Sequence, residues 1–480
     1  MFLIMVALLA ITTMCVFPKS GISIADTITL KYETLDPFFD SFYASDLMDA
    51  DSLIKLVGID SNVFRESVGK SVKLRSERVL EIQHSDPDRS SLSAFYDSLT
   101  RLKSDGGKVR VLYYGDSQIE CDRMTNYIRN EFQKEYGGSG PGLELAYQVI
   151  PTGAVRQTKS VNWKRYAAYG RKSRSVKHNN YGLLASFSRY KSLKKSSKKS
   201  KILSAWLEIK PASYGYKRLR KFSQMSLWLG GNKEDVEIKI SANSKTVFTD
   251  ELKAETFNRK INVNFPSTPR RIKISFKGLD SPDVYGLSFE SEEGIIVDNI
   301  PLRGCSGTIF SGINKTLLER QFAHEPVKLV ILQFGGNILP HIDTEAEAKR
   351  YGEAIRENLK YFKSILPESS LLVVGPSDMA TKIKGKFVTY PFLENIRDHM
   401  QRAANAEGAA YYDMFEVMGG KNSILKWIKA KPRLARRDYV HFTTKGAKKM
   451  AMSLYQALRK DNEKYINTRT DKSNAVSVKK

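Results

Sequence analysis

Runs of apolar residues divide the 480-residue chain into segments with two different rhythms. Between residues 85 and 145, and again after residue 300, short continuous apolar runs alternate with stretches in which apolar positions recur every three or four residues. The first pattern is typical of a buried strand and the second of an amphipathic helix. Strands that alternate with helices predict a largely parallel, doubly wound sheet.

In this α/β part, strands are expected at residues 109–114, 329–334, 371–374 and 409–412. Helices are expected where apolar residues stripe one face, at residues 92–102, 119–132, 348–362, 393–404 and 447–458. A different pattern separates the first strand and helix from the others. Six short alternating runs follow one another at residues 202–209, 225–229, 236–240, 261–265, 272–276 and 284–289. Regular short strands with turn residues between them predict a β-sandwich inserted into the α/β domain.

The expected organisation therefore has six parts. Residues 1–25 are a signal peptide or N-terminal anchor, and residues 26–84 are a lead-in segment of unassigned function. Residues 85–150 and 301–460 form the two parts of the α/β domain. Residues 151–300 hold a basic loop and the inserted sandwich, and residues 461–480 form a polar, disordered tail.

The first seventeen residues form an uncharged apolar run, which is shorter than the about 20 residues of a membrane span. Ser23-Ile24-Ala25 offers small residues for signal-peptidase cleavage before Asp26. The run lacks a basic start, so an uncleaved anchor is the alternative. Both readings predict that the body of the protein is exported, to the periplasm or the cell envelope.

The cysteines indicate neither a disulfide scaffold nor a zinc site. Loss of Cys15 with a cleaved signal would leave only Cys121 and Cys305. A bridge between these two and a pair of free thiols are both open. The sequence predicts no metal and no cofactor.

The formal net charge of +25 is unevenly distributed. Residues 151–201 hold fifteen Lys and Arg and no Asp or Glu, and a mobile loop that includes residues 194–199 is expected there. Such a patch on an exported protein fits an anionic surface, such as a cell-wall polymer, lipopolysaccharide or membrane headgroups. Nucleic acid is not expected as a partner, because no nucleic-acid-binding motif is recognisable.

The candidate chemistry starts at Gly115-Asp116-Ser117, where the first strand of the α/β part ends. Ser117 is expected between the end of this strand and the start of a helix, where reactive groups of α/β sheets often lie. Asp and Ser are also good helix caps, so this stretch alone fits a nucleophile and a cap equally well. Asp116 is expected to be a hydrogen-bonding residue of the turn.

Three later blocks follow other apolar runs or precede the last helix. Residues 303–308 contain Gly304 and Gly307, and residues 335–337 are Gly-Gly-Asn. Residues 438–441 begin with an Asp and end with a His. Each block alone fits an ordinary turn, loop or surface pair, but their joint order is harder to attribute to chance.

Together these blocks resemble the SGNH (GDSL-type) esterases and acyltransferases over residues 85–145 and 300–460. The resemblance implies a three-layer, flavodoxin-like α/β fold without a cofactor. It assigns Ser117 as nucleophile, His441 as base and Asp438 as the residue that orients it. The backbone amides of Ser117 and Gly307 and the side chain of Asn337 would form the oxyanion hole.

Some positions depart from the family pattern or compete for a role. Gly304 competes with Gly307, which is preferred because its separation from Asn337 suits one helix between the loop and the next strand. Ile338 follows Asn337 where many members carry an acidic residue. Cys121 stands where a small residue such as Gly is expected, and a buried thiol that plays no part in the pocket is the simpler reading. His341 is expected to be a surface residue.

The inserted sandwich is similar to the carbohydrate-binding-like insert of peptidoglycan O-acetylesterases. This likeness implies an exported serine esterase that removes O-acetyl groups from an anionic cell-wall or surface polysaccharide. One alternative is a glycan O-acetyltransferase with the same site and a membrane acyltransferase partner. Another is a non-catalytic glycan-binding protein, against which the set Ser117, Asn337, Asp438 and His441 argues.

Overall fold

The computed structural model describes residues 22–25, 28–30, 81–193, 201–212 and 215–477. In a first unit, residues 1–61, strand β1 (Ile22–Ala25) pairs antiparallel with β2 (Ile28–Leu30). Residues 1–21, where a signal or anchor is expected, and most of the lead-in lie outside the described residues. Among the helices that the structure describes, none combines the length and the apolar character of a membrane span.

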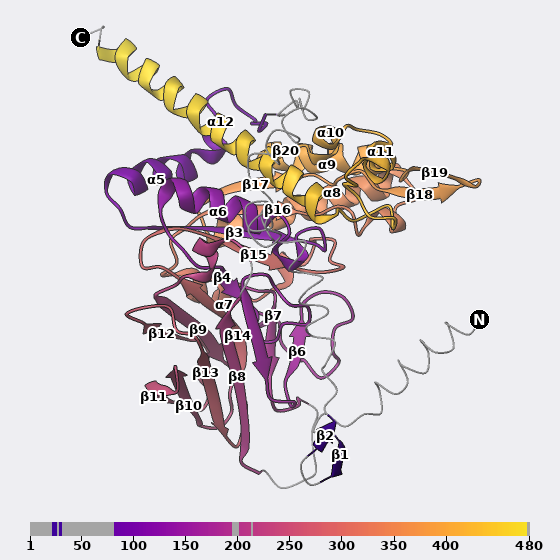
Figure 1. The fold of residues 1–480 in the computed structure, drawn as a ribbon. Coiled ribbons are helices and arrows are strands. Elements are labelled where there is room, and N and C mark those ends of the chain that lie inside the picture. The colour runs from indigo at the N-terminus through magenta and orange to yellow at the C-terminus, as the bar shows by residue number, and fades with distance from the viewer. Residues whose placement is uncertain (1–21, 26–27, 31–80, 194–200, 213–214, 478–480) are drawn as a thin grey trace, which may run out of the picture. The chain divides into compact units, whose positions relative to one another are not determined.

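A five-stranded parallel sheet forms the centre of the second unit (Figure 1). Its order is β15 (Gly294–Pro301), β3 (Lys108–Gly115), β16 (Val327–Gln333), β17 (Ser370–Val374) and β20 (Ala410–Tyr412). In chain order this is the 2-1-3-4-5 arrangement of flavodoxin-like folds. The first strand, β3, therefore lies between the second and the third. The chain crosses to one side of β3 to form β15 and then to the other side to form β16.

Helices cover both faces of this sheet, because its strands are apolar on both sides. One face packs against α5 (Ser93–Ser104), α6 (Thr125–Tyr136) and α12 (Thr444–Ser477). The other packs against α7 (Lys315–Phe322), α8 (Glu345–Ile365) and α9 (Leu393–Ala406). In β3, Val111 and Tyr113 join the first core, whereas Leu112 and Tyr114 join the second. The predicted three-layer α/β class is confirmed.

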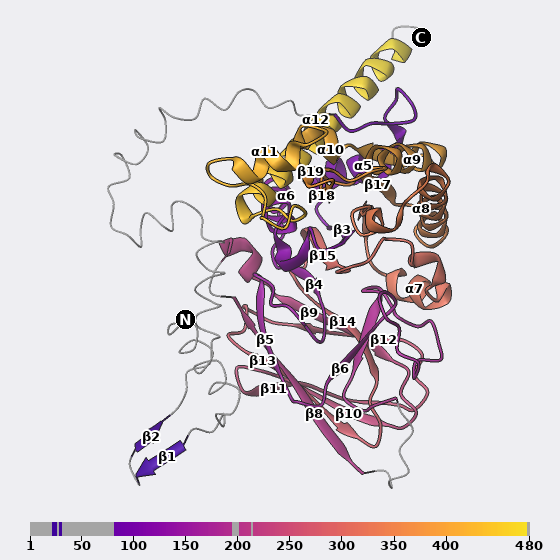
Figure 2. The ribbon, with the colours of Figure 1, turned by 90° about the vertical axis from the view of Figure 1, so that its right-hand side faces the viewer.

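The inserted domain is a sandwich of two antiparallel sheets, drawn below the parallel sheet in Figure 1 and, from another side, in Figure 2. One sheet contains β11 (Lys245–Leu252), β10 (Val236–Ala242), β13 (Ile272–Gly278), β8 (Leu203–Pro211) and β5 (Val155–Lys159). The other contains β12 (Arg259–Asn264), β9 (Gln224–Gly230), β14 (Asp283–Glu290), β7 (Ser186–Arg189), β6 (Lys164–Ala167) and β4 (Gly142–Glu144). Alternate residues of most of these strands point into a shared apolar core, whereas β4, β6 and β7 pack against the core on one face of the parallel sheet. The predicted insertion of a β-sandwich is confirmed.

The boundaries of the insertion differ from those expected at residues 151 and 300. Strand β4 already pairs with β14 of the sandwich, and β15 belongs to the parallel sheet. The continuous apolar run of β15 is buried on both faces, as in the other parallel strands. The basic stretch is also not one loop, because it contains β5, β6 and β7. Its lysines between residues 194 and 199 lie outside the described residues.

The polar C-terminal stretch continues helix α12 to Ser477 and is not a disordered tail up to that point. Asp461 is buried on this helix, 2.9 Å from His84 Nε2, and it accepts a hydrogen bond from Tyr96 at 2.8 Å. Tyr465, one turn later, is also buried. The polar composition wrongly predicted disorder here, because the polar side chains pair with residues more than 350 positions earlier in the chain.

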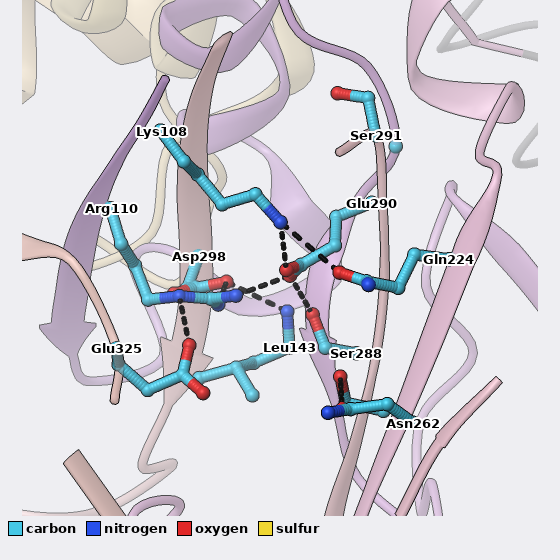
Figure 3. Close-up of polar contacts among 12 residues, drawn as sticks. Lys108, Arg110, Leu143, Gln224, Asn262, Ser288, Glu290, Ser291, Asp298 and Glu325 are labelled. Carbon is cyan, nitrogen blue, oxygen red and sulfur yellow. Dashed lines mark hydrogen bonds and ion pairs between the residues drawn. The ribbon is translucent and has the colours of Figure 1, made fainter. Parts of the chain in front are cut away.

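A buried charge cluster links the parallel sheet to the sandwich (Figure 3). Arg110 of β3 donates to Asp298 of β15 at 2.9 Å and also pairs with Glu290 of β14. Its Nε atom lies 3.1 Å from Glu325, and Lys108 lies 3.0 Å from Glu290. We call these five residues the joint cluster. It fixes the position of the sandwich against the strands that carry the candidate site.

Candidate active site

Three of the predicted blocks follow the carboxyl ends of neighbouring parallel strands. Ser117 follows β3, Gly304 follows β15 and Asn337 follows β16. Gly115, the last residue of β3, is in register with the last residues of both neighbouring strands. The three loops therefore lie side by side at the carboxyl edge of the sheet. At this point the strands that follow β3 are added on its two opposite sides. In open α/β sheets, this is the place where ligands bind.

The structure brings Ser117, His441 and Asp438 into one hydrogen-bonded chain. Ser117 Oγ lies 2.8 Å from His441 Nε2, and His441 Nδ1 lies 2.9 Å from Asp438 Oδ2. Burial raises the pKa of Asp438, but the backbone amides of His441 and Val440 and the imidazole together hold it below its usual value. Asp438 is therefore ionised at neutral pH, as a residue that orients a histidine and stabilises its charged form requires.

A hairpin supports the loop that carries Asp438 and His441. It consists of β18 (Ala380–Ile383) and β19 (Lys386–Thr389). The Phe387 ring stacks on Tyr439, with ring centroids 3.7 Å apart and 11° between the planes. The amide of Ala380 donates to the Tyr439 carbonyl at 3.0 Å. Tyr439 has a φ of 62°, so the turn between the Asp and the His adopts a left-handed conformation that these contacts hold.

Gln118 joins the same loop to the serine turn and was missed by the sequence reasoning. Its Nε2 donates to the Val440 carbonyl at 2.7 Å, and its Oε1 accepts from the Phe442 amide at 3.4 Å. The side chain thus fastens both neighbours of His441 to the residue that follows Ser117. The only signal in the sequence is this adjacency to Ser117, which does not reveal a partner more than 300 residues away.

A cavity of about 400 Å³ opens in front of Ser117 and His441. Asn337, Gly304 and His341 also line it. His341 is exposed, as expected, and it lies at the rim of this cavity. The nucleophile candidate therefore faces a space large enough for a small acyl group and part of its leaving group.

Asp116 lines the same cavity and orients the Asn337 side chain. It is buried, and one oxygen accepts from the Gln118 amide at 2.9 Å while the other accepts from Asn337 Nδ2 at 3.2 Å. Asn337 Nδ2 also donates to the Cys305 carbonyl at 3.2 Å. Burial raises the pKa of Asp116 to about 6, because the groups that oppose the shift are mostly neutral donors or lie farther away. Asp116 is a hydrogen-bonding residue of the turn, as expected.

Gly307 does not reach the cavity. Its amide donates to Cys305 Sγ at 3.3 Å, and its carbonyl accepts from Asn358 at 3.1 Å. With a φ of 83°, it packs so tightly that a Cβ would lie 2.4 Å from the Phe334 ring. Gly304 is the glycine of this loop that lines the cavity. The spacing to Asn337 could not separate the two, because both glycines lie in the same short loop.

Cys121 and Cys305 are free thiols. Cys121 has a φ of 59°, a left-handed conformation that glycine adopts more easily, which agrees with the small residue expected there. Burial raises the pKa of both thiols, that of Cys305 to about 11. Within the described residues, no three His, Cys, Asp or Glu side chains form a group that could hold a metal ion.

Comparisons with known proteins support the fold. No protein-family model and no curated protein match the chain. A solved peptidoglycan O-acetylesterase superposes with a TM-score of 0.61 and 17% identity, over 80% of this chain and 99% of that one. An acetyl xylan esterase matches 34% of this chain and 81% of its own, at 14% identity and a TM-score of 0.27. A Parabacteroides merdae protein described as a GDSL-like lipase matches 34% and 72%, at 17% identity and a TM-score of 0.25. The chain therefore shares its fold with the solved peptidoglycan O-acetylesterase over 80% of its length.

Proposed function

We propose that this protein is a serine esterase that removes O-acyl groups, acetyl in particular, from a polysaccharide. The observation that carries the proposal is the hydrogen-bonded chain from Ser117 through His441 to Asp438 at the wall of an open cavity. The likeness to a peptidoglycan O-acetylesterase, which extends over both domains, supports the choice of substrate class.

The geometry suits a two-step acyl transfer. Ser117 Oγ attacks the ester carbonyl while His441 Nε2 accepts its proton, and Asp438 stabilises the imidazolium that forms. The tetrahedral intermediate collapses when His441 returns the proton to the sugar oxygen, which leaves an acyl ester on Ser117. Water then attacks this ester by the same route, and it releases the carboxylic acid and the free serine.

The developing oxyanion needs donors on the side of the cavity opposite His441. We assign the backbone amides of Ser117 and Gly304 and the side-chain amide of Asn337 to this role, with Gly304 in place of Gly307. Asn337 is already oriented by Asp116 and by the Cys305 carbonyl. The contact with Cys305 is the one that a substrate oxygen would replace. One such donor typically stabilises the transition state by about 3–4 kcal/mol.

The charge distribution favours an anionic polymer as the substrate. The net charge is +25, and exposed arginines are close in the chain to residues of the site: Arg303 precedes Gly304, and Arg436 and Arg437 precede Asp438. Positive fields of this kind raise the local concentration of a polyanion and weaken as salt screens them. Together with the apolar N-terminal run, this charge supports action on a cell-wall or surface polysaccharide outside the cytoplasm.

The test is release of acetate from an acetylated polysaccharide and from a small acetyl ester. We expect Ser117→Ala and His441→Ala each to lower turnover of both substrates by more than about 10³-fold. The matched controls are the exposed residues Ser364→Ala and His324→Ala, which we expect to keep wild-type rates. Unchanged turnover in both site variants would overturn the proposal. If added saccharide is acetylated instead of acetate being released, the protein is an O-acetyltransferase with the same site.

A further inference from the structure

The β18–β19 hairpin projects from the α/β domain (Figure 1). Its strands are joined by a two-residue turn, Lys384-Gly385, with φ values of 46° and 79°. Positive φ at both central residues defines a type I′ turn, in which Asn, Asp or Gly is favoured at the first position. Lys384 occupies that position, so a charge stands at the end of the hairpin although the turn favours other residues. Residues 382–387 are all exposed, and we call them the hairpin tip.

The hairpin tip combines exposed apolar side chains with lysines. Ile383 is 42% exposed and Phe387 is 38% exposed, although the Phe387 ring also stacks on Tyr439. Lys386 lies opposite Ile383 on the neighbouring strand, and Lys382 lies opposite Phe387. Exposed apolar surface is unfavourable in water, whereas a long lysine side chain beside it can hold its ammonium group outside an apolar phase. This pairing suits a boundary between water and an apolar layer.

The segments that support the hairpin are basic. Thr389 of β19 exchanges hydrogen bonds of 2.7 and 3.1 Å with Asn422, the residue before α11 (Ser423–Lys429). The loop after α11 is joined to the active-site loop, because the Arg436 amide donates to the His441 carbonyl at 2.8 Å. Residues 417–449 contain ten Lys and Arg and a single acid, Asp438. Exposed lysines that form no ion pair among the described residues lie on the tip, on α11 and just after it: Lys382, Lys384, Lys386, Lys426, Lys429 and Lys431.

The charge of this region fits any polyanion, but the apolar side chains favour a lipid surface. Near an anionic membrane, lysines are attracted to the lipid phosphates, and apolar side chains enter the boundary between headgroups and acyl chains. A soluble polyanion would contact the lysines and leave Ile383 in water, with no gain from its apolar surface. Because the hairpin tip is short and projects from the domain, it can enter such a boundary while the rest of the domain stays in water.

We propose that the hairpin tip and the exposed lysines of α11 bind the surface of an anionic lipid membrane. Ile383 and the exposed part of Phe387 enter the boundary below the headgroups, while the three tip lysines contact lipid phosphates. Because Phe387 stacks on Tyr439, this contact brings the loop that carries His441 close to the membrane. The inference goes beyond the proposed esterase function and does not depend on it, since lipid binding is measured without an ester.

The experiment measures the partition of the full chain onto sedimented vesicles in about 0.1 M salt. One set of vesicles contains equal amounts of phosphatidylglycerol and phosphatidylcholine, and the other contains phosphatidylcholine alone. The readout is the ratio of the two partition coefficients, because an apolar segment elsewhere in the chain would favour both vesicles alike. A lysine near an anionic surface strengthens binding about fivefold. We therefore expect wild-type protein to prefer the anionic vesicles by at least about 100-fold.

A triple variant tests the charge of the tip. It replaces all three lysines of the hairpin tip by Gln, and the ratio should fall by at least about thirtyfold. The matched control removes the same charge from exposed positions of the sandwich, and its ratio should fall by less than about threefold. It replaces three lysines by Gln: Lys239, Lys245 and Lys277.

Variants of Ile383 test entry into the lipid boundary. Ile383→Ser should weaken partition onto the anionic vesicles by about threefold to tenfold, because less apolar surface leaves water. Ile383→Trp should strengthen it, and its emission should shift to shorter wavelength with vesicles but not with dextran sulfate, since Trp favours the membrane interface. Val247→Ser is the matched control, because Val247 is 41% exposed on β11 of the sandwich.

Equal partition of the wild type onto the two vesicles, or a ratio that falls no more in the tip variant than in its control, would overturn the inference. Unchanged partition in Ile383→Ser would also overturn it, because the region would then respond to charge alone and fit a soluble polyanion. Selective vesicle binding without ester turnover would sustain the membrane contact and overturn only the proposed esterase. Ester turnover without selective vesicle binding would have the opposite meaning.

Discussion

Asp116 at the candidate site and Glu290 in the joint cluster are both buried carboxyls, yet their pKa values move in opposite directions. Burial raises the pKa of Asp116 to about 6. Burial would raise that of Glu290 too, but Arg110 and Lys108 outweigh it and hold the value at about 2 (Figure 3). The difference is the presence of cations in direct contact. The joint cluster neutralises its buried charges, whereas the site leaves a carboxyl with mainly neutral partners.

This difference separates polar groups with a structural role from polar groups with a chemical role. The joint cluster is largely buried, with the Lys108 side chain 18% exposed, and it connects strands from both domains, so its geometry is over-determined. The chain at Ser117 is partly open: the side chain of His441 is 30% exposed and that of Asp438 is 46% exposed. We therefore expect changes in the first region to act on stability and changes in the second to act on turnover.

Arg110→Met should produce the largest effect on stability. It leaves the buried Asp298 without its cation and removes one of the two cations that pair with Glu290 and with Glu325, which keep Lys108 and Lys260. Such a loss typically costs about 3–5 kcal/mol. The measurement is the free energy of unfolding in urea. Arg350→Met on an exposed face of α8 is the control. A loss below about 1 kcal/mol would mean that the joint cluster does not hold the two domains together.

Asn337→Ala should lower turnover strongly and stability only slightly. Removal of one oxyanion donor is expected to lower kcat by about 10²–10³-fold, or about 3–4 kcal/mol of transition-state stabilisation. The free energy of unfolding should change much less. Asn264→Ala, at an exposed position of the sandwich, should keep the wild-type kcat. An equal loss of stability and kcat would mean that Asn337 acts on folding and not on chemistry.

Comparison of wild type with Asp116→Asn should reveal the raised pKa of Asp116 as a pH dependence of the free energy of unfolding. A carboxyl whose pKa is raised on folding contributes stability that is complete below its unfolded value of 3.8 and is lost as pH rises through about 6. The unfolding free energy of wild type relative to Asp116→Asn should therefore fall by about 3 kcal/mol over this range. Glu290→Gln should give the opposite slope, because the lowered pKa of Glu290 makes its contribution disappear below pH 4.5. If the free energy of unfolding, relative to wild type, changed with pH in the same direction for both variants, the opposite pKa shifts of Asp116 and Glu290 would be contradicted.

Phe387→Leu should have the smallest effect. It removes the ring stacked on Tyr439, an interaction of about 0.5–1.5 kcal/mol, and so loosens the loop that carries His441. We expect kcat/KM to fall by about threefold to tenfold, with little change in unfolding. Ile383→Ala, another exposed apolar position of the same hairpin, should leave kcat/KM unchanged. If both variants lower kcat/KM equally, the effect comes from the apolar side chains of the hairpin in general and not from the stacking of Phe387 on Tyr439.

Much of the fold and the order of the site blocks followed from local patterns in the sequence. Continuous apolar runs identified four of the five strands of the parallel sheet, and Ser117, Asn337 and the Asp438–His441 pair stand where the chain turns at the sheet edge. These signals are local because strand ends and tight turns are determined by neighbouring residues. The short strands β5, β6 and β7 were missed because they lie in the basic stretch, which lacks a clear alternation.

The features that could not be predicted depend on contacts between distant residues. Gly304 and Gly307 are equivalent in sequence, and only the packing of Phe334 decides which of them faces the cavity. Gln118 and Asp461 are ordinary polar residues until their partners are known.

In the proposed mechanism, Ser117 carries the acyl group during turnover. Peptide mass mapping of protein quenched in acid within milliseconds of mixing with a small acetyl ester tests this step directly. We expect an acetyl group on Ser117, absent after Ser117→Ala and strongly reduced after His441→Ala. Acetyl on another residue such as Cys121, or continued ester turnover by Ser117→Ala with no acetyl on the serine turn, would contradict it.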